Sequence, residues 1–142
     1  MIELTHERKL GTTKGTELEE AVKMNFRGET AEVGLYLAMS RQAFREGYPE
    51  VGLVLKELAY EEADHAAQFA ELNGLISEST EKNIRKMLNG ESAANKGKRL
   101  NAVKAKEINI DPAHDVFDEA ARDEGRHARA LEGLIKRYFN GE

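Results

Sequence analysis

Apolar residues recur along the chain at the three- and four-residue intervals of amphipathic helices, and turn-forming residues divide this pattern into segments. Thr16, followed three residues later by Glu19, predicts a capping box at the start of a first helix that runs to Gly47. Pro49, favoured in a first helical turn, predicts a second helix that continues to residues 73–74, where Asn-Gly is a stop signal. These two helices are separated by a very short connection.

A polar stretch at residues 77–80 introduces a third predicted helix, which extends to about Asn109. Asp111-Pro112 opens a fourth that runs to about Phe139. Residues 1–15 contain two glycines and no periodicity, so we expect an irregular N-terminal arm, followed by one helical domain over residues 16–142. The pattern predicts an all-α protein.

One apolar stripe runs along each of the second and fourth segments. Its members are Val51, Leu55, Leu58, Phe69 and Leu72 in the second segment and Val116, Phe117, Ala120, Leu131 and Leu134 in the fourth. Glu62 and His65 lie within the first stripe, and Glu124 and His127 take the matching place in the other. Charged and imidazole groups on a core-facing stripe are costly unless they are paired or bind a metal. Their placement indicates a site.

The two halves of the helical region are related by an internal repeat. Residues 28–72 align without a gap with residues 90–134 at a constant offset of 62, and eleven positions are identical. In each half a glutamate, Glu29 or Glu91, precedes the Glu-x-x-His of the next helix by 33 residues. The sequence therefore predicts two related helical hairpins.

The repeated residues form the ligand set of a di-metal carboxylate bundle. Glu and His three apart on a helix point the same way, so each pair can bind one ion. A glutamate from each of two helices, with Glu-x-x-His from the other two, suits a pair of iron or manganese ions. We expect Glu62 and Glu124 to bridge the metals while Glu29 and Glu91 each cap one. The six predicted ligands are Glu29, Glu62, His65, Glu91, Glu124 and His127.

A single Glu-x-x-His in a helix rich in glutamate is usually accidental, whereas its recurrence at equivalent repeat positions indicates a metal site. Tyr36 lies two turns after Glu29 on the same face and is a candidate to hydrogen-bond a ligand carboxylate, although an ordinary packed tyrosine fits equally well. Its repeat counterpart is Lys98.

Composition narrows the class of protein. The net charge of −5 argues against non-specific nucleic-acid binding, because phosphate contacts need clustered Lys and Arg. The absence of cysteine excludes disulfides, zinc-thiolate and iron–sulfur sites and thiol catalysis within this chain. No apolar run is long enough for a signal peptide or a membrane span, which predicts a cytoplasmic protein.

Four stretches of the sequence resemble the ferritin-like di-iron domain of the rubrerythrins, and in particular the reverse rubrerythrins. They are GETAEVGLYLAM (28–39), EGYPEV (46–51), YEEADHA (60–66) and DEGRHA (123–128). The resemblance covers nearly everything after the N-terminal arm. It implies a four-helix bundle and a non-haem di-iron peroxidase that reduces hydrogen peroxide to water, with electrons from a rubredoxin-type iron site. Because a rubredoxin module needs four cysteines, the donor must be a separate protein.

The resemblance also implies a seventh carboxylate, three residues after a first-helix ligand, that takes part in redox-dependent ligand switching. Glu32 follows Glu29 at that spacing, whereas Ala94 follows Glu91. We expect Glu32 to be the peroxidase-specific residue, the alternative being a solvent-facing glutamate. Only one of the two metals could then use it.

Only 29 residues separate Glu62 from Glu91, and about 9 of them must be extended for one chain to complete the site by itself. The linker near residues 73–80 is barely sufficient. We therefore expect a homodimer in which the first hairpin of one chain pairs with the second hairpin of another.

Two alternative functions fit the same sequence. One is a ferroxidase or iron-binding ferritin-like role, and the other is a structural bundle with vestigial ligands.

Overall fold

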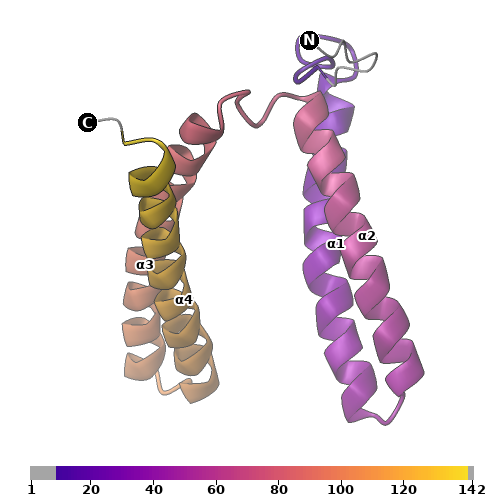
Figure 1. Ribbon diagram of the computed structural model, residues 1–142. Coiled ribbons are helices and arrows are strands. Elements are labelled where there is room, and N and C mark those ends of the chain that lie inside the picture. The colour runs from indigo at the N-terminus through magenta and orange to yellow at the C-terminus, as the bar shows by residue number, and fades with distance from the viewer. Residues whose placement is uncertain (1–8, 141–142) are drawn as a thin grey trace. The chain divides into compact units, whose positions relative to one another are not determined.

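The computed structural model describes residues 9–140, which form four α-helices arranged as two helical hairpins (Figure 1). The all-α prediction is confirmed, and this part of the chain contains no strand. Residues 1–8 of the predicted arm lie outside the described residues. The two hairpins are separate compact units that divide between residues 78 and 79. The helices are α1 (Glu19–Arg45), α2 (Pro49–Leu72), α3 (Thr80–Glu107) and α4 (Asp111–Tyr138).

The start of α1 differs from the predicted capping box. The residue before the helix is Leu18, and no side chain caps the first turn. The Thr16 hydroxyl donates instead to the Thr13 carbonyl at 2.6 Å, and the Glu19 carboxylate accepts from the Gly15 N–H at 3.0 Å. Both side chains therefore form hydrogen bonds with the backbone of the turn that precedes the helix, and the prediction of a capping box was wrong.

Residues 9–18 form turns that cover the C-terminal end of α2. The Thr13 N–H and hydroxyl both donate to the Leu72 carbonyl, at 3.0 and 2.8 Å, which satisfies a backbone group that has no partner within the helix. Asn73, which is buried, donates to the Glu19 carbonyl at 2.9 Å. This amide therefore ties the end of α2 to the start of α1.

Small side chains line the contact between α1 and α2. The buried residues of α2 are Gly52, Ala59 and Ala66, spaced seven apart, and Ala59 is fully buried. A Cβ added at Gly52 would come within 2.7 Å of the Phe44 ring, so only glycine leaves room for that ring. Small residues at heptad spacing let the two backbones approach closely.

The second hairpin repeats this arrangement with alanines on both helices. Ala102 and Ala105 are the buried residues of α3, and the fully buried Ala121 of α4 is the repeat counterpart of Ala59. Asn95 on α3 donates to the Ala121 carbonyl at 2.5 Å and so joins the two helices.

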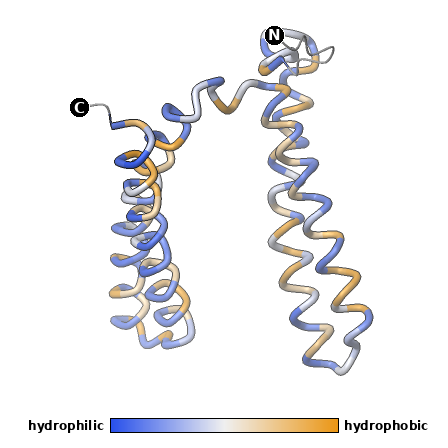
Figure 2. The backbone as a smooth tube through the Cα atoms, in the orientation of Figure 1, coloured by the Kyte–Doolittle hydropathy of each residue, from blue (hydrophilic) through white to orange (hydrophobic). Residues whose placement is uncertain are grey.

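The larger apolar residues of the predicted stripes flank these small-residue contacts. Val51, Val116 and Leu134 are exposed, while the other predicted positions of the two stripes are half-buried. Within each hairpin, alanine and glycine occupy the face between the paired helices, and these larger residues lie beside it. Figure 2 shows apolar and polar positions alternating along each helix. No helix within residues 9–140 is long and apolar enough to span a membrane.

Candidate metal centre

The first hairpin gathers three of the predicted ligands into one group. Glu29 comes from α1, and Glu62 and His65 come from α2, one turn apart. Each offers a ligand atom, and the three atoms lie within 4.8 Å of one another. His65 Nδ1 is 3.2 Å from Glu62 Oε2 and 3.8 Å from Glu29 Oε2. We call these three residues the first half-site.

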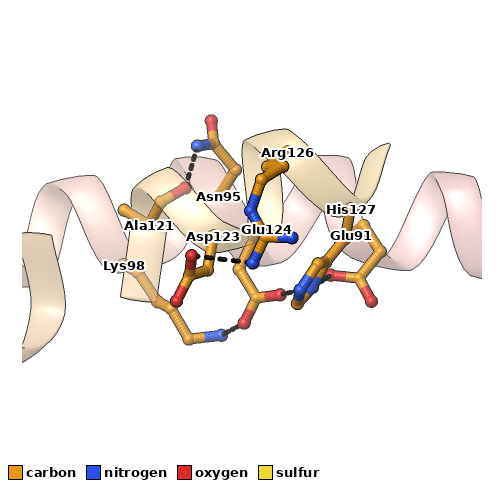
Figure 3. Close-up of polar contacts among 8 residues, drawn as sticks. All are labelled: Glu91, Asn95, Lys98, Ala121, Asp123, Glu124, Arg126 and His127. Carbon is orange, nitrogen blue, oxygen red and sulfur yellow. Dashed lines mark hydrogen bonds and ion pairs between the residues drawn. The ribbon is translucent and has the colours of Figure 1, made fainter. Parts of the chain in front are cut away.

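The second hairpin gathers Glu91, Glu124 and His127 in the same way, and we call them the second half-site. His127 Nδ1 is 3.2 Å from Glu124 Oε2 and 3.6 Å from Glu91 Oε2 (Figure 3). The four carboxylates of the two half-sites are mostly shielded, with side-chain exposures of 18–19%. The repeat seen in the sequence therefore brings equivalent groups together in both hairpins.

Crowding of the carboxylates perturbs the first half-site. The pKa of Glu29 is raised, first by its contact with the Glu62 carboxyl and then by burial. The pKa of Glu62 is lowered by Glu29 and by His65, and the pKa of His65 is raised, chiefly by the Glu62 carboxylate. Without a metal ion, the crowded groups therefore raise the pKa of Glu29 and of His65 and lower the pKa of Glu62.

The second half-site has a stronger asymmetry between its two carboxylates. The pKa of Glu91 is raised by the Glu124 carboxyl and by burial. The pKa of Glu124 is lowered to about 2, first by Glu91 and then by the Lys98 ammonium. Glu124 is therefore an anion over the whole neutral range.

The residues fit a metal ion. Glu29 Oε2 is buried and accepts no hydrogen bond from any described residue, which is a costly state for a carboxylate oxygen. A cation bound between Glu29, Glu62 and His65 would satisfy it. Two carboxylates and one imidazole are donors that suit iron and manganese. Each half-site supplies three of the six ligands of a di-metal centre.

Two further predicted residues, Glu32 and Tyr36, lie outside the group of three. Glu32 is exposed and lines the same shallow hollow as Glu29, together with Gly28. Tyr36 is half-buried, and among the described residues its hydroxyl has no hydrogen-bond partner. Their proposed roles stay predictions.

One charged contact was not predicted from the sequence. Lys98 Nζ lies 2.5 Å from Glu124 Oε1 and joins α3 to α4 beside the second half-site (Figure 3). The signal in the sequence was the repeat itself, in which Lys98 aligns with Tyr36 at the offset of 62.

Comparison of the sequence with known proteins assigns the chain to a family. Residues 20–135, which contain all six ligand candidates, match the rubrerythrin family. The chain belongs to the rubrerythrins. Among related rubrerythrin-like sequences, it is 47% identical to reverse rubrerythrin-1 of Clostridium acetobutylicum over 136 residues, which are 94% of this chain and 75% of that protein. It is 62% identical to an uncharacterized protein of Methanocaldococcus jannaschii over 138 residues, or 97% and 98% of the two chains.

The resemblance seen in the sequence to the rubrerythrins is thus confirmed. Membership of the family supports a ferritin-like fold, bound iron and a redox role connected with oxidative stress.

Proposed function

We propose that this rubrerythrin is a non-haem di-iron peroxidase, which reduces hydrogen peroxide to water with electrons from a separate rubredoxin-type donor. The observation that carries the proposal is the pair of equivalent Glu, Glu, His half-sites, one on each hairpin. When bound, two ferrous ions would supply the two electrons that convert one peroxide and two protons into two waters. A cytoplasmic location, as expected from the sequence, is part of this proposal.

The chain's own residues have distinct parts in it. The six half-site residues hold the ions, and Glu29 and Glu91, whose pKa values are raised, must be deprotonated to do so. In this proposal Glu32, in the hollow beside Glu29, is the seventh carboxylate. The Tyr36 hydroxyl would donate a hydrogen bond to a ligand carboxylate once the metal centre is assembled.

A homodimer completes the centre in this proposal. For two half-sites related by a twofold axis to share a pair of ions, α2 and α3 must run in the same direction. If both helices belonged to one chain, the linker between them would have to return from the end of α2 to the opposite end of the bundle, where α3 begins. The helical residues between Glu62 and Leu72 and between Thr80 and Glu91 measure about 32 Å. The chain from Leu72 to Thr80 reaches at most about 28 Å. Pairing the first hairpin of one chain with the second of its partner removes this mismatch.

The metal centre is tested first, by metal analysis of the purified protein after iron loading. Two ions per chain are expected, and Glu62→Ala and Glu124→Ala should each lower this number. Wild-type protein without stoichiometric metal would favour the structural-bundle alternative.

The reaction is tested by mixing the diferrous protein with peroxide or with dioxygen in a stopped-flow instrument. Faster reaction with peroxide, and turnover with added rubredoxin, are expected. Faster reaction with dioxygen and accumulation of ferric mineral would identify a ferroxidase instead. Chemical crosslinking and solution scattering test the dimer, and a monomer with full metal occupancy would contradict it.

A further inference from the structure

The two half-sites differ in one charged contact. In the second hairpin the Lys98 ammonium lies against Glu124 Oε1, and His127 contacts the other oxygen, Oε2, so both oxygens of Glu124 have a partner (Figure 3). The Lys98 side chain is 32% exposed and that of Glu124 is 18% exposed. The ion pair is therefore partly shielded from water, where charge-assisted hydrogen bonds are strong.

The equivalent place in the first hairpin is occupied by a tyrosine in place of the lysine. Tyr36 is the residue at the repeat offset from Lys98, and a tyrosine side chain has no ammonium group. Among the described residues, the only cationic group within ion-pair distance of Glu62 is the imidazole of its own half-site, His65. Glu32 also adds a negative charge beside Glu29, where the second hairpin has Ala94.

The first half-site together with Glu32 and Tyr36 has three carboxylates, Glu29, Glu62 and Glu32, and no lysine. The second carries two carboxylates and one ammonium. A divalent cation is attracted more strongly to the first arrangement, because a fixed positive charge a few ångströms away repels the ion and weakens its binding. An ion that needed Glu124 Oε1 would also have to displace Lys98.

We propose that Lys98 is a positioning residue which holds Glu124 through Oε1 and makes the second half-site bind a metal ion more weakly than the first, so that the two ions load in a fixed order. This inference rests on the proposed metal centre and deepens it. Because the charge resides on a side chain outside the ligand set, it can be removed without removing a ligand.

The test is a titration of the metal-free full chain with Mn²⁺, in which free Mn²⁺ is followed by its electron paramagnetic resonance signal. Wild-type protein is expected to bind in two classes, whose dissociation constants differ by about tenfold or more. In Lys98→Met the weaker class should tighten by about tenfold and the tighter class by less, because Glu124 is also expected to bridge the two ions. Lys98→Arg should keep the wild-type difference between the classes. Circular dichroism checks that each variant is folded.

Lys96→Met is the matched control, because Lys96 is an exposed lysine of the same helix, two residues away. It should leave both classes unchanged. Tyr36→Lys is the reciprocal variant, and it should weaken the tighter class so that the two classes merge. This second variant keeps the inference testable if Lys98→Met does not fold.

The outcomes separate this inference from the proposed function. Stoichiometric Mn²⁺ binding with classes that Lys98→Met and Tyr36→Lys do not move would overturn the role of Lys98 and leave the metal centre intact. Wild-type protein that binds no stoichiometric Mn²⁺ and no iron would overturn both.

Discussion

Gly47 and Asn109, 62 residues apart, adopt the same left-handed backbone conformation at the turns of the two hairpins, with φ angles of 84° and 60°. In each case the backbone N–H of the following residue donates to a carbonyl in the last turn of the preceding helix. Tyr48 donates to the Ala43 carbonyl at 2.8 Å and Ile110 donates to the Ala105 carbonyl at 2.9 Å. The internal repeat is therefore preserved in the backbone at positions where the residues themselves differ.

This conformation predicts how substitutions at the two turns affect stability. Gly47→Ala should lower the free energy of unfolding by about 1–2 kcal/mol, because a Cβ is strained at positive φ. Asn109→Gly should be neutral or slightly stabilising. Urea denaturation followed by circular dichroism measures both. Gly133→Ala is the control, since Gly133 lies within α4 with open space around it, and it should raise stability by about 0.5–1 kcal/mol.

The amide of Asn73 is the second point at which stability is predicted to depend on one side chain. Asn73→Ala removes a buried group that donates to the Glu19 carbonyl and accepts from the Thr13 hydroxyl. The loss should be about 1–3 kcal/mol, because it leaves the Glu19 carbonyl and the Thr13 hydroxyl without this partner.

Urea denaturation again gives the measurement, with Asn25→Ala as the matched control. Asn25 is exposed and donates only to the Ala21 carbonyl within its own helix. It should change stability by less than about 0.5 kcal/mol. Equal effects of the two substitutions would show that Asn73 does not secure the end of α2.

The helices and the ligand groups could be predicted from the sequence because their signals are local or repeated. Pro49 and the Asp111-Pro112 pair fix helix starts through backbone restrictions that any context preserves, and both observed helices begin there. The half-site residues could be recognised because the same spacing occurs twice.

Other features depended on tertiary contacts that periodicity does not describe. Thr16 has the residue type of a cap, but its hydroxyl accepts from the Leu18 N–H, and the helix begins three residues later, at Glu19. Val116 has the periodicity of a core residue, yet the small side chain of Ala121 is what allows α3 and α4 to meet. The Lys98–Glu124 ion pair needs two particular rotamers on different helices, which the sequence alone does not specify.

Glu32 provides a prediction about activity. If it is the seventh carboxylate, Glu32→Gln should lower the rate of peroxide reduction by about tenfold or more, as expected when one group acting in the reaction is lost. The iron content should stay at the wild-type value, because the six half-site ligands remain. Steady-state peroxide consumption and metal analysis on the same sample measure the two quantities.

The control for this variant is Glu50→Gln, which makes the same change at an exposed position in the first turn of α2. It should leave both rate and iron content unchanged. A Glu32→Gln protein with full activity would identify Glu32 as a solvent-facing glutamate.

The first half-site predicts that metal binding depends on pH. The Glu62 carboxylate raises the pKa of His65 above its ordinary value, and the pKa of Glu29 is raised by the Glu62 carboxyl and burial. An ion binds only the deprotonated imidazole and carboxylate, so the affinity falls as the pH falls through these raised pKa values. Below the pKa of His65, the dissociation constant for Mn²⁺ should rise by about tenfold per pH unit for each proton displaced.

Mn²⁺ titrations between about pH 6 and pH 8 check this dependence, and proton release into a weak buffer measures the number of protons directly. His114→Ala is the control, because that imidazole pairs with Asp115 and belongs to neither half-site. Its profile should match the wild-type profile, whereas His65→Ala should weaken binding and flatten the dependence. Tight stoichiometric binding that did not vary over this range would mean that the His65 imidazole is not a ligand, because a ligand nitrogen that is protonated in the free protein must give up its proton to the solvent.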